Sequence, residues 1–269
     1  MSAGPGSREP RPEPRSVDPP PPSEARRRLE EIAGRHGLPI RAVERLELLL
    51  DLLARDPRAP TAVREPGQAV DRHVADSLVA LELDVVRDAR VVADVGSGAG
   101  FPGLALAVAK PGADVRLLES SARACGWLER AARELGLGHV AVINARAEDW
   151  RQGIAGHDLV VSRAVASLPV ILEYGAPLLQ MDGALVLWRG APRAGELEAG
   201  RRAADVLGLR LAQRGPVTPF AGAKRRFLYL YLKVRETPSR FPRRTGMAAK
   251  RPLSGLAAPA ENSQHPPEP

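Results

Sequence analysis

Apolar residues between positions 23 and 88 recur with the spacing of amphipathic helices. In the stretch RAVERLELLLDLLA, one helical face carries Val43, Leu46, Leu49, Leu50 and Leu53. The later stretch AVDRHVADSLVALEL repeats this pattern. We therefore predict that residues 23–88 form a helical N-terminal cap whose helices each bury one face.

From residue 90 onward, short apolar runs alternate with helical segments. The runs are RVVADV, DVRLLE, VAVINA, DLVVSR, ALVLW, RLAQR and RRFLYLYLKV, and helices should begin near Pro102, Ala122, Leu168 and Ala194. This alternation predicts a parallel sheet with helices on both faces. The last two runs are joined by GPVTPFAGAK, which is too short for a helical crossover, so they should pair antiparallel. The expected fold is α/β and Rossmann-like, with a mostly parallel seven-stranded sheet in residues 89–236.

Proline is concentrated at both ends of the 269-residue chain. Of the 26 prolines, eight lie in residues 1–22 and seven in residues 237–269. Segments of this composition bury too little apolar surface to offset the entropy of ordering. We therefore expect a disordered Pro-rich tail at 1–22 and a disordered basic, Pro-rich tail at 237–269.

The charge and cysteine content narrow the class of protein. The 39 Lys and Arg residues outnumber 32 Asp and Glu residues, and the resulting charge of +7 favours a polyanionic partner such as nucleic acid, although basic charge also serves solubility. The single cysteine, Cys125, excludes an intramolecular disulfide, and its position inside a predicted helix indicates a core residue. The N-terminus lacks the apolar core of a signal peptide, and no apolar run reaches membrane length. We expect a cytoplasmic protein with no membrane partner.

The stretch VVADVGSGAGFPG places alternating glycines directly after the first predicted strand. In a Rossmann-like sheet this turn lies against the ligand. Gly96, Gly98 and Gly100 depart by one residue from the G-x-G-x-x-G dinucleotide fingerprint, and the carboxylate of Asp94 suits a cation better than a pyrophosphate. S-adenosylmethionine carries a sulfonium and an ammonium. We therefore expect Asp94, Gly96 and Gly98 to contact this cofactor, with a nicotinamide or flavin dinucleotide as the alternative ligand.

The next two predicted strands end in groups that suit an adenosyl cofactor. Glu119, at the end of the second strand, could accept hydrogen bonds from both ribose hydroxyls, although ribose occurs in either alternative ligand. The third strand ends in NARAED, which places Ala147, Glu148 and Asp149 where a backbone amide and an acidic side chain could read an adenine ring.

Four segments, RHVADSL, DVGSGAGFPGLALA, RAED and VSRAVASLP, closely resemble in order and spacing the small-subunit ribosomal RNA methyltransferase G family, also called glucose-inhibited division protein B. The resemblance covers about residues 42–233. It implies a class I S-adenosylmethionine-dependent methyltransferase that methylates N7 of a guanine in 16S ribosomal RNA. Carried over by motif, the cofactor contacts are Gly96, Phe101, Ala147, Glu148 and Arg163.

Two segments depart from the family pattern. Members usually have W-N-K-x-x-N-L-T after the first helix, whereas this chain has LARDPRAPT, so no role is assigned to the missing Trp, Lys and Asn. The usual Lys-Gly after the fifth strand is Arg189-Gly190 here. This change keeps the positive charge but replaces the compact ammonium group of Lys with the planar guanidinium of Arg.

The chemistry of guanine N7 requires little catalytic machinery. Because N7 has an available lone pair, no base must remove a proton, and alignment and electrostatics can supply the catalysis. Arg163, at the end of the fourth predicted strand, is the candidate catalytic residue, since it could bind guanine O6 or a phosphate and leave N7 free. Alternatively, it only pairs with an acid such as Glu148. Cys125 has no preceding proline, and SRAVASLP lacks the Asn/Asp-Pro-Pro-aromatic motif, so methylation of pyrimidine C5 or of an exocyclic amine is not indicated.

The histidines and the polar residues near them indicate neither a hydrolase triad nor a metal site. His73, Asp76 and Ser77 lie within one helical turn and lack a separate nucleophile turn, which favours hydrogen bonding between helices over hydrolysis. The remaining histidines show no ligand spacing, so we expect no metal site.

Basic residues near the end of the fifth strand and before the last one are the candidate RNA contacts. These are Arg189, Lys224, Arg225 and Arg226. We expect a monomer that acts on 16S ribosomal RNA or the small ribosomal subunit. Two alternatives stay open: a small-molecule methyltransferase with an incidental basic rim, and an RNA-binding or assembly protein that keeps the cofactor pocket without turnover.

Overall fold

A seven-stranded sheet forms the centre of the molecule in the computed structural model, which describes residues 23–191, 195–223 and 226–253. The strand order is β3-β2-β1-β4-β5-β7-β6, and β7 alone runs in the opposite direction to the other six strands. The strands are β1 (Val91–Val95), β2 (Asp114–Glu119), β3 (Val140–Asn144), β4 (His157–Arg163), β5 (Leu179–Arg189), β6 (Leu209–Pro216) and β7 (Phe227–Lys233). The predicted α/β fold, with a mostly parallel sheet and an antiparallel final pair, is confirmed.

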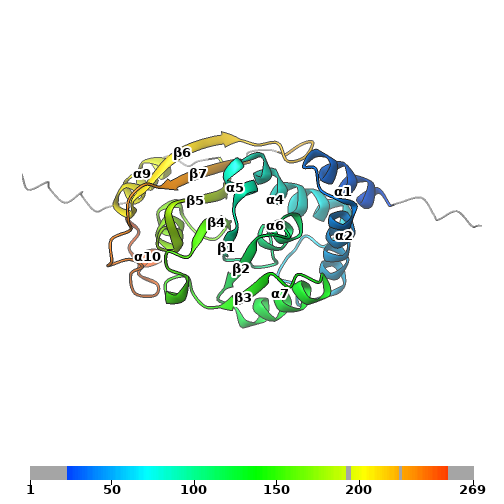
Figure 1. Ribbon diagram of the computed structural model, residues 1–269, viewed down its shortest axis with the longest axis horizontal. Helices are drawn as coiled ribbons and strands as arrows, with labels where there is room; N and C mark the ends of the chain where they lie inside the picture. Colours follow the sequence, from blue (N-terminus) through cyan, green and yellow to red (C-terminus); the bar gives the residue numbers. More distant parts are fainter. Residues whose placement is uncertain (1–22, 192–194, 224–225, 254–269) are drawn as a thin grey trace, which may run out of the picture.

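Helices cover both faces of the sheet (Figure 1). One face packs against α6 (Gly103–Ala109), α7 (Ala122–Glu134) and the N-terminal helices, and the other against α8 (Leu168–Gly175) and α9 (Glu196–Leu207). Two buried apolar clusters result, one on each face. Between β3 and β4 the described chain has only a 3₁₀ turn, Arg151–Gly153, in place of a helix.

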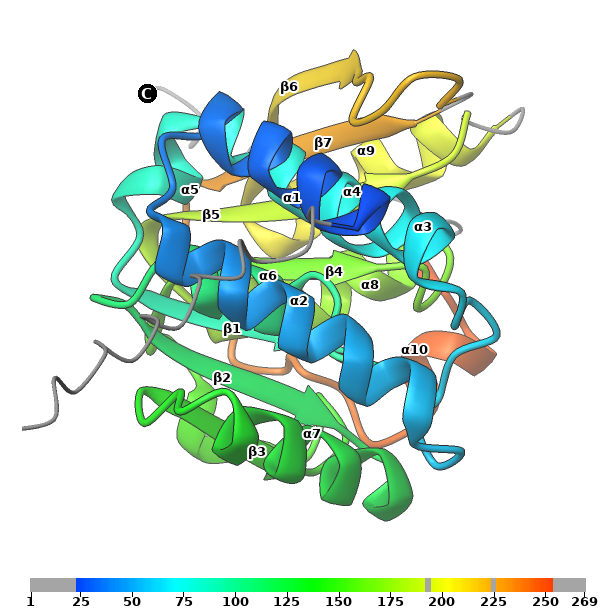
Figure 2. The same cartoon turned by 90° about the vertical axis from the view of Figure 1, so that its right-hand side faces the viewer.

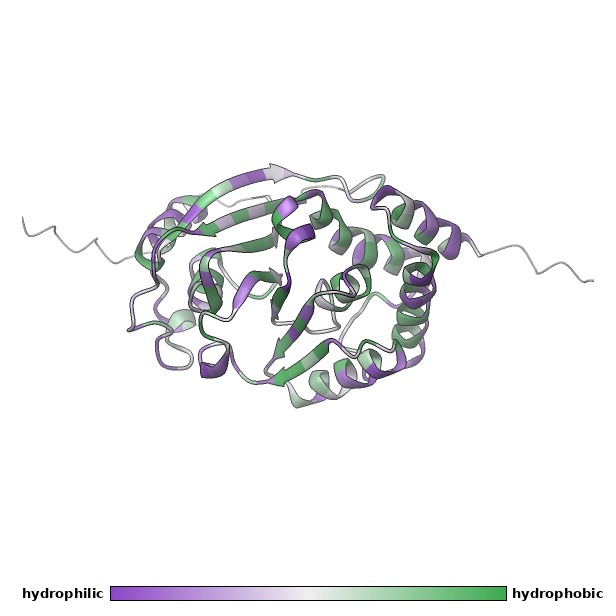
Figure 3. Ribbon diagram, viewed as in Figure 1, coloured by the Kyte–Doolittle hydropathy of each residue, from purple (hydrophilic) through white to green (hydrophobic). Residues whose placement is uncertain are grey.

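The N-terminal segment is helical, as its periodicity predicts. Its elements are α1 (Glu24–Arg35), α2 (Ile40–Arg55), α3 (Pro66–Ala69), the π-helical turn η1 (Val70–Ala75), α4 (Asp76–Leu78), the 3₁₀ turn η2 (Val79–Glu82) and α5 (Asp84–Asp88). The apolar face of α2 buries Val43, Leu46, Leu49, Leu50 and Leu53. In Figure 3 strand β3 is green along most of its length, whereas β6 and the outer end of α1 are largely purple. The helical N-terminal segment therefore extends the apolar core on one face of the sheet.

The segment after β7 differs from its prediction. Residues 237–253 fold back over α8 and end in the short helix α10 (Met247–Lys250), which lies beside α8 (Figure 2). Phe241, Ala248 and Leu253 are buried there. The prediction of disorder from residue 237 onward is therefore wrong for residues 237–253, because these three side chains reach a core that composition alone does not reveal. The tail at 1–22 and residues 254–269 lie outside the described residues.

Candidate functional site

The glycine turn after β1 adopts a backbone that side chains would obstruct. Gly96, Gly98 and Gly100 all have positive φ angles, of 74°, 52° and 97°. A Cβ on Gly96 would lie 2.4 Å from a methyl carbon of Val165, whereas a Cβ on Gly98 would meet its nearest atom at 3.9 Å. The turn thus packs tightly against the loop after β4 at Gly96 and leaves open space at Gly98, so a ligand can approach the backbone closely.

Asp94 does not take the position that the sequence suggested. It is fully buried, its Oδ2 accepts the Gly103 amide at 3.0 Å, and its Oδ1 has no hydrogen-bond partner among the described residues. Burial raises the pKa of this carboxyl to about 7, partly offset by the Gly103 amide. The expected contact between Asp94 and the cofactor is corrected: Asp94 lies beneath the turn and ties β1 to the start of α6.

A cavity of about 630 Å³ opens at the carboxyl ends of β1, β2 and β3. Five of the predicted cofactor residues line it: Gly96, Glu119, Ala147, Glu148 and Arg163. Tyr174 of α8 and Ala249 of α10 complete the lining on the far side, and the sequence reasoning identified neither. The cavity lies where the strand order reverses between β1 and β4, the usual ligand position in such sheets.

Glu119 is fixed at the edge of this cavity by the glycine turn and by its own strand end. Its Oε2 accepts the Gly98 amide at 3.1 Å, and its Oε1 accepts the Ser121 amide at 2.8 Å. Gly98 is not among the residues that line the cavity, so its shown contact is to Glu119. A half-buried carboxylate held in this way has lone pairs left for hydroxyl donors.

Phe101 also lies outside the lining of this cavity. Its ring is buried and stacks on His73, with ring centres 4.5 Å apart and planes at 9°. The Arg163 guanidinium lies 5.9 Å from the centre of the same ring. The side chain of Phe101 therefore packs against His73 and Arg163, and it does not line the cavity predicted to hold the cofactor.

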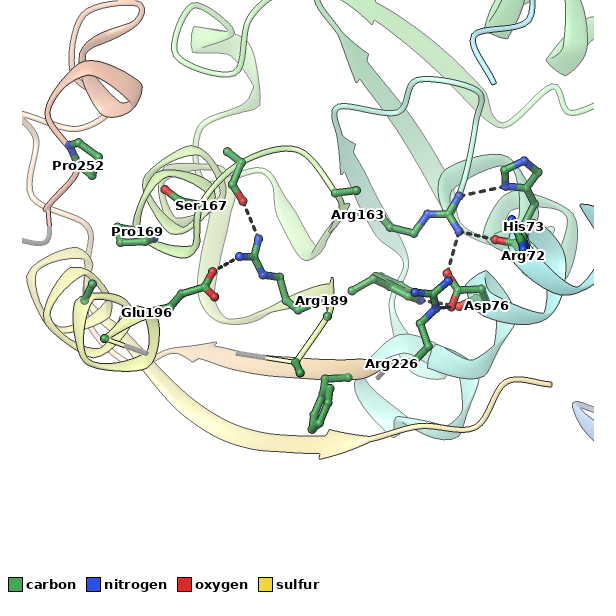
Figure 4. Close-up of a pocket in the computed structure, with 18 of the residues that line it drawn as sticks. Arg72, His73, Asp76, Arg163, Ser167, Pro169, Arg189, Glu196, Arg226 and Pro252 are labelled. Carbon is green, nitrogen blue, oxygen red and sulfur yellow. Dashed lines mark hydrogen bonds and ion pairs between the residues drawn. The ribbon is translucent and has the colours of Figure 1, made fainter. Parts of the chain in front are cut away.

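A second cavity of about 1060 Å³ adjoins the first. Figure 4 shows side chains that line this second cavity. Four residues line both cavities: Arg163, Ala164, Ala166 and Ser167. The second cavity also receives Arg72, His73 and Asp76 from the N-terminal helices and Arg189 and Arg226 from β5 and the start of β7. The end of β4 and the loop after it thus form a wall between a pocket at the glycine turn and a basic pocket facing the cap.

Arg163 is held firmly in this wall. Its Nη1 donates to Asp76 Oδ2 at 2.9 Å and to the Arg72 carbonyl at 3.0 Å, and its Nη2 lies 3.4 Å from His73 Nδ1. Its pairing partner is therefore Asp76 and not Glu148. These contacts use three of the five N–H donors of a guanidinium, so within the described part of the chain two remain for a ligand.

His73 is neutral beside this arginine. Burial, followed by the charge of Arg163, lowers the pKa of His73 to about 4. Accepting a hydrogen bond at Nδ1 places the ring proton on Nε2, which lies 3.1 Å from Thr61 Oγ1. His73 thus acts as an acceptor and a stacking surface, and the predicted hydrogen bonding between helices is wrong for its side chain, because its partners Thr61 and Arg163 lie on the loop before α3 and at the end of β4.

Asp76 is the residue whose function the sequence reasoning missed. Its side chain is 5% exposed and pairs with two arginines, Arg163 at 2.9 Å and Arg226 at 3.1 Å. The spacing of His73 and Asp76, three residues apart on one helix, was a signal that they share a face. It could not show that this face meets the end of β4.

Of the four predicted RNA residues, two lie in the described part of the chain, and both line the second cavity. Arg189 lines the second cavity but donates to the Ala166 carbonyl at 2.6 Å and pairs with Glu196, so it braces the shared loop against α9. Arg226 is 40% exposed at the same cavity. Lys224 and Arg225 lie outside the described residues.

Other expectations concern chemistry away from the cavities. Cys125 is buried, as predicted, and its thiol donates to the Glu119 carbonyl. Among the described residues, no group of three or more His, Cys, Asp or Glu side chains is arranged to hold a metal ion. No helix in the described ranges is long and apolar enough to cross a membrane.

Comparisons with known proteins identify the family of this chain. A sequence model of the family described as rRNA small subunit methyltransferase G matches residues 42–218. The ribosomal RNA small subunit methyltransferase G of Rubrobacter xylanophilus is 43% identical over 222 residues, covering 79% of this chain and 85% of that protein. The protein of the same name from Carboxydothermus hydrogenoformans is 39% identical over 196 residues, covering 72% and 83%. Among solved structures, a predicted O-methyltransferase from Agrobacterium tumefaciens aligns with a TM-score of 0.47 at 20% identity, covering 60% of this chain and 80% of that one. The chain belongs to the rRNA small subunit methyltransferase G family.

Proposed function

We propose that this protein transfers a methyl group from S-adenosylmethionine to N7 of a guanine in 16S ribosomal RNA. The observation that carries the proposal is the pair of adjoining cavities that share Arg163 and the loop after β4. One cavity has the glycine turn and a carboxylate at a strand end, and the other is basic. A donor and an RNA base could thus meet at the wall that both cavities share.

The residues of the first cavity fit S-adenosylmethionine. Gly96 brings the glycine turn to the cavity wall, Glu119 presents a fixed carboxylate, and Ala147 and Glu148 follow β3 at the same edge. In this arrangement Glu119 binds the ribose hydroxyls, while Ala147 and Glu148 lie beside the adenine. When bound, the cofactor supplies an electrophilic methyl group on its sulfonium.

Arg163 orients the guanine. Its two remaining N–H donors can bind O6 of the base and leave the N7 lone pair free to attack. No group needs to accept a proton before this attack, and the second cavity provides no candidate base among its described residues. Asp76 and Glu196 are both ion-paired, and His73, with its pKa near 4, already donates its ring proton toward Thr61.

The basic residues of the second cavity serve the RNA backbone. Arg72 and Arg226 line it, and Lys224 and Arg225 precede Arg226 in the chain. Arg189 contributes by holding the shared loop in place and, through its charge, by attracting phosphate. The protein acts as a cytoplasmic monomer on 16S ribosomal RNA or on the small ribosomal subunit.

The test is transfer of radiolabelled methyl groups to small ribosomal subunits and to purified 16S ribosomal RNA, followed by nuclease digestion. We expect the label in 7-methylguanosine and its loss in Arg163→Ala. Arg210→Ala, on the exposed edge strand β6, is the matched control and should transfer normally. Label found only in small molecules would favour the small-molecule alternative. Binding of RNA and cofactor without any label would favour an assembly protein.

A further inference from the structure

The segment after β7, residues 237–253, is called the C-terminal strap here. It lies beyond the part of the chain that the family model matches, which ends at residue 218. The strap buries Phe241, Ala248 and Leu253, and of these Phe241 and Leu253 join the apolar cluster on the α8 and α9 face. It is thus attached to the domain along its length.

A buried ion pair reinforces this attachment. Glu173 of α8 is fully buried, and Arg243 approaches both of its oxygens, with Nε at 2.7 Å from Oε1 and Nη2 at 2.6 Å from Oε2. The same Nη2 donates to the Arg251 carbonyl at 2.8 Å, which closes the strap on itself. Without Arg243, Glu173 would be a buried carboxylate with no counter-charge, so the strap and the domain are expected to form together.

Between Arg243 and Arg251 the strap touches the predicted adenine end of the cofactor cavity. The Gly246 amide donates to Glu148 Oε1 at 2.9 Å, and the Thr245 hydroxyl donates to Asp149. Ala249, an exposed residue of α10, lines the cavity together with Tyr174 and Glu148. The strap therefore reaches the cavity wall at two points, through one hydrogen bond and one side chain.

We propose that residues 245–249 of the C-terminal strap are part of the cofactor site and form the outer wall of its adenosine-binding end. Gly246 keeps the carboxylate of Glu148 directed along this wall, and Ala249 covers the bound adenosine. This inference rests on the proposed function in one respect, since it places the adenosyl cofactor in this cavity.

The first test uses thiol labelling of the full-length protein, whose own cysteine is buried. Ala249→Cys and Lys250→Cys are each treated with a maleimide, with and without S-adenosylhomocysteine. Lys250 is also exposed but does not line the cavity, so it is the matched control. At a ligand concentration ten times the dissociation constant, about one tenth of the protein is free, so labelling at position 249 should slow about tenfold. Labelling at position 250 should change less than twofold.

The second test uses calorimetry with S-adenosylhomocysteine. Ala249→Trp should weaken binding at least about tenfold, because the indole would occupy space that the adenosine needs, whereas Lys250→Trp should not change it. Failure of the native protein to bind S-adenosylhomocysteine would overturn the proposed function and this inference with it. Normal binding with equal labelling at positions 249 and 250, or with no effect of Ala249→Trp, would overturn the inference alone.

Discussion

Replacing Asp76 with asparagine tests whether the N-terminal helices position the arginine that orients the base. The substitution keeps the shape of the side chain and one acceptor oxygen. It removes the charge that Arg163 and Arg226 share at 2.9 and 3.1 Å, in a site where the Asp76 side chain is only 5% exposed. Arg163 then keeps its bonds to the Arg72 carbonyl and to His73, but loses its only ion-pair partner in the described residues.

The size of the effect follows from the kind of bond that is lost. A hydrogen bond to a charged partner contributes about 1.5 to 3 kcal/mol, and one between neutral groups about 1 kcal/mol, so the change weakens the hold on Arg163 by about 0.5 to 2 kcal/mol. If this hold is needed only in the transition state, the maximal single-turnover rate should fall about 2- to 30-fold. Cofactor affinity should stay within about twofold, because Asp76 does not line the cofactor cavity.

The assay is single-turnover methylation of small ribosomal subunits, with calorimetry of S-adenosylhomocysteine and thermal unfolding in parallel. Asp71→Asn is the matched control: Asp71 begins the same helical stretch and pairs with Arg28 at 3.3 Å, with its side chain 33% exposed. An unchanged rate in Asp76→Asn would refute the positioning role. An equal loss in both variants, or a loss that follows the melting temperature, would show that Asp76 acts only through stability.

Three further predictions concern Glu119, Asp94 and the basic residues 224–226. Glu119→Ala should weaken binding of S-adenosylmethionine by about 1 to 3 kcal/mol in calorimetry, because the ribose loses its charged acceptor. Asp114→Ala, at the opposite end of β2, is the control and should not weaken binding. Equal affinities of the two variants would show that Glu119 is not part of the site. Because the folded-state pKa of Asp94 is raised to about 7, the native state binds the extra proton, and stability should fall by up to about 4 kcal/mol as pH rises from 4 to 7. Chemical denaturation across this range should show a smaller fall in Asp94→Asn, and an identical pH profile would contradict the raised pKa. Charge reversal of residues 224–226 should flatten the slope of log RNA affinity against log salt concentration by roughly 0.7 to 0.9 per lost phosphate contact, and it should leave cofactor affinity unchanged. An unaltered slope would show that RNA binds to another surface.

The sequence by itself determined the sheet and the turn. The apolar runs predicted all seven strands, and the four helices expected near Pro102, Ala122, Leu168 and Ala194 begin within two residues of those positions. This succeeded because central strands buried on both faces appear as continuous apolar runs, and helices with one buried face appear as a 3.6-residue period, so the sequence records burial locally. Alternating glycines likewise report a backbone conformation that the turn itself requires, as the positive φ angles show.

Only the tertiary structure decided how charged side chains pair. Asp94 follows the apolar run of β1 and looked like a ligand group, but the packing of α6 turns it inward to Gly103. Arg163 meets Asp76 across 87 positions of sequence, and Arg243 meets Glu173 across 70. The composition of residues 237–253, rich in Pro and Arg, predicts disorder. In the structure this segment is part of the domain, because its Arg243 pairs with the buried carboxylate of Glu173. Local patterns record burial and backbone shape, whereas the partner of a charge is set by which distant elements the fold brings together.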